Sequence, residues 1–248
     1  GPATAAELSG PGGIAVTRAK AGAFLFRPSC KGLIAAAGIF AAVLPLRAGE
    51  STGPPPPGSY ALDHIQRVPA GIVLEDTRFP RALSRYTTGA ITLFAFFYSY
   101  CADPNGCPLA WDAFENVREG IIARAKLHGR VRLVFMSLDP MHDTPVMLMG
   151  FARRYEASAS IVRWHFLTTY SNLFLKPVLR DMGEEISIDR EASGGGGVVI
   201  NHLPKVFLID RRGFVREIYS NQSLDPAMIL GDIETLLLEE STANGHKE

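Results

Sequence analysis

Two nearly uninterrupted apolar segments, residues 91–98 (ITLFAFFY) and 131–138 (VRLVFMSL), are the features that most constrain the fold. Neither segment alternates apolar with polar residues. Apolar runs of this length are typical of strands that are buried on both faces of a sheet. Between them, apolar residues recur at helical spacing from Ala110 until His128 and Gly129 end the pattern. Strand, helix and strand in this order indicate an α/β fold.

The rest of the domain continues this alternation. Four further elements are expected: a helix capped by Thr144 and running to about 157, a helix capped by Ser171 and ending near 183, a hairpin of 205–210 with 214–219, and a last helix from Pro226 to about 239. We predict a thioredoxin-like three-layer sandwich, in which helices flank a central mixed β-sheet. The length from 70 to 240 suits one such domain.

The front of the chain differs in charge from the rest. Residues 1–48 carry five basic residues and one acid, whereas the remaining 200 carry 20 basic and 24 acidic residues. Residues 32–46 are apolar and uncharged, and they lie between Lys31 and Arg47. This pattern is typical of a signal peptide cleaved after Ala48. The stretch is shorter than the roughly 20 residues that a membrane-spanning helix needs, but an uncleaved membrane anchor remains an alternative.

We therefore expect four parts: a leader with signal peptide or membrane anchor over 1–48, a Pro/Gly-rich linker over 49–69, a folded domain over 70–240, and a polar tail over 241–248. The 25 basic residues of the whole chain are balanced by 25 acids, which argues against a nucleic-acid partner. Cleavage would remove Cys30, and the two cysteines left are too few for a disulfide scaffold.

The segment 100–108 (YCADPNGCP) carries these two cysteines, Cys101 and Cys107, between the first expected strand and its helix. This is where α/β folds place ligand sites. Residues 103–106 (DPNG) have strong turn chemistry, so the loop should fold back and bring the two sulfurs together. Cys107 should begin the helix, where the helix dipole favours a thiolate. Thiolates serve in soft-metal binding and in disulfide exchange, and a purely structural disulfide is the alternative.

His202 is the second candidate site residue. It follows four glycines at 194–197 and comes directly before the expected strand 205–210. A glycine-rich loop would let this side chain swing toward the cysteines. Neutral imidazole is a good copper ligand, and two thiolates would complete a three-coordinate soft site. Taken alone, His202 fits a hydrogen-bonded loop residue better than a metal ligand, but its position beside a strand of the same sheet favours the ligand.

These segments together resemble the Sco/SenC family of thioredoxin-fold copper proteins. Four stretches carry the resemblance in order: FFYSYCADPNGCP, VFMSLDPMHDTP, INHLPKVFLIDRRG and the amphipathic last helix. The resemblance implies that Cys101, Cys107 and His202 bind one copper per domain, as Cu(I) or Cu(II). It also implies an exported, often membrane-tethered factor that helps to assemble the copper centre of cytochrome c oxidase. The implied partners are a copper-receiving oxidase subunit and a copper donor chaperone.

The chain departs from the family pattern at three points. Five residues separate its cysteines, where the family has three. Asn201 stands where the family more often has Asp, and Pro204 resembles the cis-proline that faces the cysteine pair in thioredoxin-like reductases. Met141 and His142 are soft donors for an auxiliary copper contact, or residues of an exposed loop. Asp139 and Asp143 in the same segment are expected to be turn and cap residues instead of catalytic acids.

Three functions are compatible with this pattern. The first is a copper-binding metallochaperone that passes copper to a partner. The second is a thiol–disulfide reductase in which Cys101 and Cys107 form the catalytic redox pair and keep partner cysteines reduced before metal insertion. The third is a binding-only domain with a permanent disulfide. The leader indicates a periplasmic protein, with tethering through 32–46 or a mitochondrial intermembrane-space location as alternatives.

Overall fold

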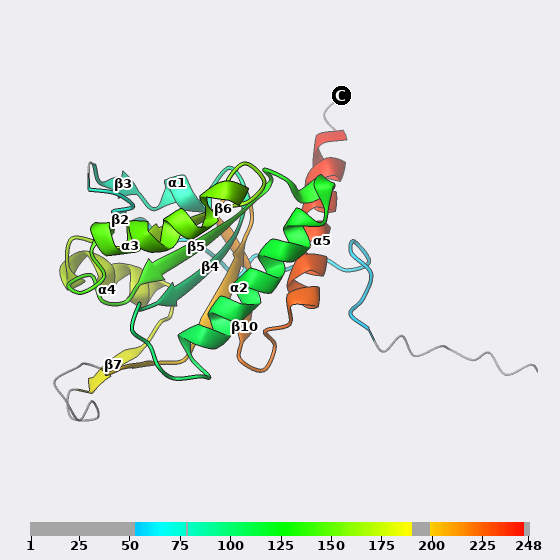
Figure 1. Ribbon diagram of the computed structural model, residues 1–248. Coiled ribbons are helices and arrows are strands. Elements are labelled where there is room, and N and C mark those ends of the chain that lie inside the picture. The colour runs from blue at the N-terminus through cyan, green and yellow to red at the C-terminus, as the bar shows by residue number, and fades with distance from the viewer. Residues whose placement is uncertain (1–52, 78, 190–198, 246–248) are drawn as a thin grey trace, which may run out of the picture. The chain divides into compact units, whose positions relative to one another are not determined.

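The computed structural model describes residues 53–77, 79–189 and 199–245 (Figure 1). The predictions about the leader 1–48, its apolar stretch 32–46, Cys30 and the glycines at 194–197 lie outside the described residues. Within the described ranges, no helix combines the length and the apolar character needed to cross a membrane.

Six strands form the central sheet, in the order β1-β10-β9-β4-β5-β6. Their bounds are β1 Gln66–Arg67, β4 Ile91–Phe97, β5 Val131–Ser137, β6 Arg163–Leu167, β9 Lys205–Ile209 and β10 Phe214–Ser220. Strand β4 runs parallel to β5, and β5 runs parallel to β6. Strand β9 is antiparallel to both β4 and β10. The predicted mixed sheet is confirmed, and the two apolar segments form the adjacent strands β4 and β5.

Two small hairpins lie outside this sheet. One pairs β2 Ile72–Val73 with β3 Arg81–Ala82, and the other pairs β7 Ile186–Asp189 with β8 Val199–His202. The second hairpin was not predicted. Its strand β7 projects from the domain on the side toward which the arrows of β4 and β5 point (Figure 1).

The helices flank the sheet, as predicted for this fold. They are α1 Ser84–Thr87, α2 Cys107–Ile122, α3 Pro145–Ala152, α4 Asn172–Asp181 and α5 Pro226–Gly245, with 3-10 helices at Ala125–Leu127 and Arg153–Ser158. Helices α2 and α5 lie next to each other (Figure 1).

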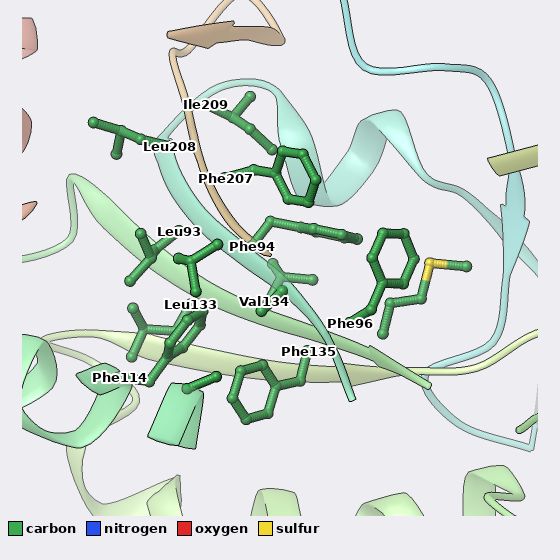
Figure 2. Packing of buried hydrophobic residues seen from close by; sticks show 14 of the residues in the cluster. Leu93, Phe94, Phe96, Phe114, Leu133, Val134, Phe135, Phe207, Leu208 and Ile209 are labelled. Carbon is green, nitrogen blue, oxygen red and sulfur yellow. The ribbon is translucent and has the colours of Figure 1, made fainter. Parts of the chain in front are cut away.

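Side chains from neighbouring positions fill both faces of the central strands (Figure 2). On one face, the Phe94 ring of β4 lies 6.2 Å from the Phe207 ring of β9. On the other face, Phe135 of β5 lies 4.4 Å from Phe114 of α2, measured between ring centroids. All four rings are buried. Burial on both faces explains why the two apolar segments show no alternation.

Element boundaries differ from the sequence predictions at several places. Helix α2 ends at Ile122 instead of near His128, and Nε2–H of His128 donates to the Ile122 carbonyl oxygen at 2.9 Å, which satisfies one carbonyl of the last turn. Thr144 and Ser171 hold the predicted N-cap positions of α3 and α4, but neither side chain makes a capping hydrogen bond. Helix α3 gives way to a 3-10 helix after Ala152.

Two elements reach into segments expected to be irregular. Strand β1 lies within the expected linker 49–69 and pairs with β10. Helix α5 continues to Gly245, into the expected polar tail. Hydrogen bonds made by the linker and tail segments are thus part of the fold.

Candidate metal centre

The loop between β4 and α2 holds the two cysteines close together. Cys101 lies four residues after the end of β4, and Cys107 is the first residue of α2. Between them, the Gly106 N–H donates to the Asp103 carbonyl oxygen at 2.9 Å and closes the predicted turn. A Cβ at Gly106 would lie 3.3 Å from Cys101 Sγ, so the glycine leaves room for this sulfur at the start of α2. Both cysteines are free thiols, and Cys101 lies close enough to raise the pKa of Cys107.

The β7–β8 hairpin brings His202 to the same loop. His202 is the last residue of β8 and pairs with Ile186 of β7. Its Nε2 lies 3.9 Å from Cys107 Sγ. Its Nδ1 is buried and has no hydrogen-bond partner among the described residues. Burial lowers the pKa of His202, so the ring is neutral at pH 7 and offers a lone pair to a metal ion.

These three residues do not yet form a closed metal cluster. In the ranges that the structure describes, no three His, Cys, Asp or Glu side chains converge closely enough to hold a metal ion. The approach of these side chains is pairwise: Cys107 Sγ lies 3.9 Å from His202 Nε2, while Cys101 raises the pKa values of both Cys107 and Tyr98. Two thiols and a neutral imidazole are soft donors that suit copper. The donor set therefore fits the ion by its chemistry, although the three side chains do not converge in this structure.

The structure contradicts the prediction that Cys107 is a thiolate because it lies at a helix N-terminus. Its side chain is buried, and burial raises its pKa, outweighing the hydrogen bonds from backbone N–H groups that lower it. The neighbouring Cys101 thiol raises it further. Loss of hydration destabilises the thiolate by more than the helix dipole stabilises it, because the dipole contributes only about 1 kcal/mol. Cys107 is thus protonated at neutral pH in the metal-free protein, and a bound metal must displace the proton.

Asp143 is a structural support of the site that the sequence reasoning missed. We expected a turn or cap residue, but its carboxylate is fully buried. It accepts hydrogen bonds from the Ser99 N–H, the Ser99 hydroxyl and the Ser137 hydroxyl. Asp143 therefore ties the residues just before Cys101 to the end of β5. The available sequence signal was the pair of aspartates that directly follows a buried strand.

Asp139 is the turn residue that was predicted, and its neighbours lie beside the cysteine loop. Its carboxylate accepts hydrogen bonds from the N–H groups of Met141 and His142 and from the Tyr100 hydroxyl. The His142 ring lies 4.5 Å from the Tyr100 ring, and its Nδ1 lies 3.0 Å from Asp143 Oδ1. Met141 is 69% exposed. In the described part of the chain, no contact joins Met141 or His142 to either cysteine.

The three departures from the family pattern have different structural consequences. The turn at 103–106 absorbs the longer spacer between the cysteines. Asn201 is exposed and pairs with Ser187 of β7. The Leu203–Pro204 peptide is trans, since no described residue has a cis peptide bond, so the resemblance of Pro204 to a cis-proline does not hold.

A groove of about 290 Å³ opens beside the cysteines. Both thiols line it, together with Tyr98, Trp111 and Arg154. Aromatic residues thus form part of the groove wall next to the two sulfurs.

Comparisons with known proteins identify the family. The sequence model of the SCO1/SenC family matches residues 77–238, whereas no curated protein sequence matches significantly. The solved structures with the same fold include apo Sco1 from Thermus thermophilus. It is 21% identical with a TM-score of 0.56, and the match covers 71% of this chain and 96% of that protein.

Copper-bound ScoI from Arabidopsis thaliana is 17% identical with a TM-score of 0.58, and the match covers 70% of this chain and 99% of that protein. BsSco, described as a Sco-family cytochrome c oxidase assembly protein with a disulfide switch, is 21% identical with a TM-score of 0.52 and coverage of 71% and 96%. The family match spans most of the folded domain, and the chain belongs to the SCO1/SenC family.

Proposed function

We propose that this protein is a copper-binding assembly factor that delivers copper to a cuproprotein, with the copper centre of cytochrome c oxidase as the destination. The observation that carries the proposal is the 3.9 Å approach of His202 Nε2 to Cys107 Sγ, with Cys101 beside it. The copper-bound state of the Arabidopsis relative and the assembly role of BsSco support it.

His202, Cys107 and Cys101 differ in protonation and exposure, so we expect them to play different roles in copper binding. His202 is neutral and needs to lose no proton, whereas the Cys107 thiol gives up its proton as the metal–sulfur bond forms. Cys101 is partly exposed on the loop, so it is the ligand that an acceptor can replace first. Delivery by ligand exchange would then start at Cys101 and end at Cys107.

The test of this proposal is copper content and transfer. The reduced protein should retain one copper after desalting, and the Cys101→Ala/Cys107→Ala double variant should retain none. His128→Ala is a matched control, because His128 lies at the far end of α2 and caps Ile122. One copper per chain in the double variant would contradict the proposal.

A thiol–disulfide reductase remains the second candidate. The observation that favours it is that both cysteines are free thiols on one loop, with Cys101 close enough to raise the pKa of Cys107, and the disulfide switch of BsSco supports it. In this case the reduced His202→Ala variant should reduce an oxidised partner peptide at the same rate as the wild-type protein. Because both cysteines are free thiols, the structure gives no support to a permanent disulfide.

We also propose that the protein is exported to the periplasm. The support is the basic, acid-poor leader over 1–48 with its apolar stretch 32–46. Tethering through 32–46 would keep the domain at the inner membrane, near an oxidase subunit and a copper donor. Cell fractionation of the full chain with and without 32–46 tests this, and a cytoplasmic full chain would contradict it.

A further inference from the structure

A second pocket lies at the opposite end of the sheet from the cysteines. It has a volume of about 470 Å³, and its lining includes Val131 at the start of β5 and Arg163 at the start of β6. The cysteine loop follows the carboxyl end of β4. Because β4, β5 and β6 are parallel, the amino ends of β5 and β6 lie at the opposite edge of the sheet.

Three arginines line this pocket: Arg85, Arg132 and Arg163. Arg132 and Arg163 are direct neighbours in the register of β5 and β6. The Arg132 guanidinium is held in place by two backbone carbonyls, since Nη1 donates to the Arg85 oxygen at 2.7 Å and Nη2 to the Thr88 oxygen at 2.8 Å. Burial lowers the pKa of Arg132, and the charge of Arg85 lowers it further. Three positively charged side chains thus line one pocket, and hydrogen bonds hold the Arg132 guanidinium in place.

Pairing with carboxylates decides whether the donors of these arginines are available to a ligand. Among the described residues, none of the three makes an ion pair. The one acid in the lining, Glu75, is bound within the pocket wall to two other lining residues: His165 Nδ1 lies 2.5 Å from Oε1, and the Tyr86 hydroxyl donates to Oε2 at 2.9 Å. Its single negative charge offsets only one of the three arginines. The pocket therefore keeps a net positive charge with guanidinium donors left over.

We propose that Arg85, Arg132 and Arg163 form a binding site for a phosphate ester. Guanidinium groups bind phosphate oxygens in pairs of parallel hydrogen bonds, and converging positive charges raise the local concentration of an anion. The volume of about 470 Å³ is in the range of small-molecule sites, so it admits a phosphate together with an organic substituent. The ester is either a soluble metabolite or an anionic lipid headgroup.

A headgroup would have a consequence for the proposed copper delivery. The pocket and the cysteine loop lie at opposite ends of the parallel strands. A lipid bound in the pocket would therefore hold the cysteine loop on the side of the domain that faces away from the bilayer.

The first arm of the test measures a soluble ester. We would titrate the full chain with glycerol 3-phosphate at low salt by calorimetry, using wild type and the Arg85→Gln/Arg163→Gln double variant. Arg132 is left intact, because it supports the backbone around α1. The control is Arg153→Gln/Arg180→Gln, which removes two exposed arginines outside the pocket and the same net charge. We expect at least a tenfold weaker affinity in the pocket variant and less than a twofold change in the control.

The second arm measures flotation of the same proteins with vesicles of one part phosphatidylglycerol and three parts phosphatidylcholine. All variants share the same leader, so only a difference between the pocket and control variants counts. A pocket-specific loss of binding in the first arm indicates a soluble ester, and a pocket-specific loss in flotation alone indicates a headgroup. The proposal is overturned if neither arm separates the pocket variant from the control variant. Equal melting temperatures of the variants show that folding is intact, and neither arm depends on copper.

Discussion

Glu184 should make the stability of this domain fall between acid and neutral pH. The residue lies in the turn between α4 and β7, at the base of the hairpin that carries His202. It is 5% exposed, and neither carboxylate oxygen has a hydrogen-bond partner among the described residues. Lys205 donates instead to the Gly183 carbonyl oxygen at 2.5 Å. Burial raises the pKa of Glu184 to about 7, although the charge of Lys205 opposes this.

The sign and size of the effect follow from this pKa. In the unfolded chain the group titrates near 4.5. The folded state therefore keeps the proton where the unfolded state loses it, so the stability is fully present below about pH 4.5 and is lost as the pH rises through 7. Each unit of pKa difference corresponds to about 1.4 kcal/mol, so the gap from 4.5 to about 7 corresponds to about 3 kcal/mol.

Glu184→Gln removes the buried charge. We expect the free energy of unfolding of this variant to exceed that of wild type by up to about 3 kcal/mol at pH 8, and the difference to shrink toward pH 5. Urea denaturation across this pH range measures it. Glu185→Gln is the matched control, because Glu185 is the exposed neighbour and should leave the wild-type pH dependence unchanged. If Glu184→Gln shows the same pH dependence as wild type, the reasoning is refuted.

Three further outcomes are expected. Asp143→Ala leaves three hydrogen-bond donors without an acceptor, so it should lower the free energy of unfolding by about 3 kcal/mol in urea titrations; a loss below about 1 kcal/mol would contradict the anchoring role. In the reduced metal-free protein, iodoacetamide should label Cys101 at least about tenfold faster than the buried Cys107, and equal rates by peptide mass spectrometry would show that burial does not control reactivity. Tyr219→Phe removes one of the two hydroxyls that donate to the buried Asp232 and should cost about 1–2 kcal/mol of unfolding free energy, whereas an unchanged melting curve would argue against this bond.

Local patterns were enough to predict the main frame of the fold. Strands β4 and β5 were predictable because burial on both faces requires continuous apolar segments. The β9–β10 hairpin was predictable because its turn contains a glycine. The turn at 103–106 was predictable for the same reason.

Contacts between distant segments were not predictable. The β7–β8 hairpin pairs Ile186 with His202 across a 16-residue separation, and its strands of four residues each are too short to give a distinctive sequence pattern. The bonds from Asp143 to Ser99 span 44 residues. The acidity of Cys107 was predicted wrongly because the helix dipole can be inferred from sequence, whereas the degree of burial depends on the complete packing.

The most direct measurement of the central claim is an anaerobic titration of the reduced protein with Cu(I) and with Cu(II), alongside His202→Ala and the control His128→Ala. The account predicts thiolate-to-copper charge-transfer absorption on addition of Cu(II), saturation at one equivalent, and clear weakening of binding by His202→Ala but not by His128→Ala. No saturable binding of either ion, or equal binding by all three proteins, would contradict the assignment of Cys101, Cys107 and His202 as the copper site.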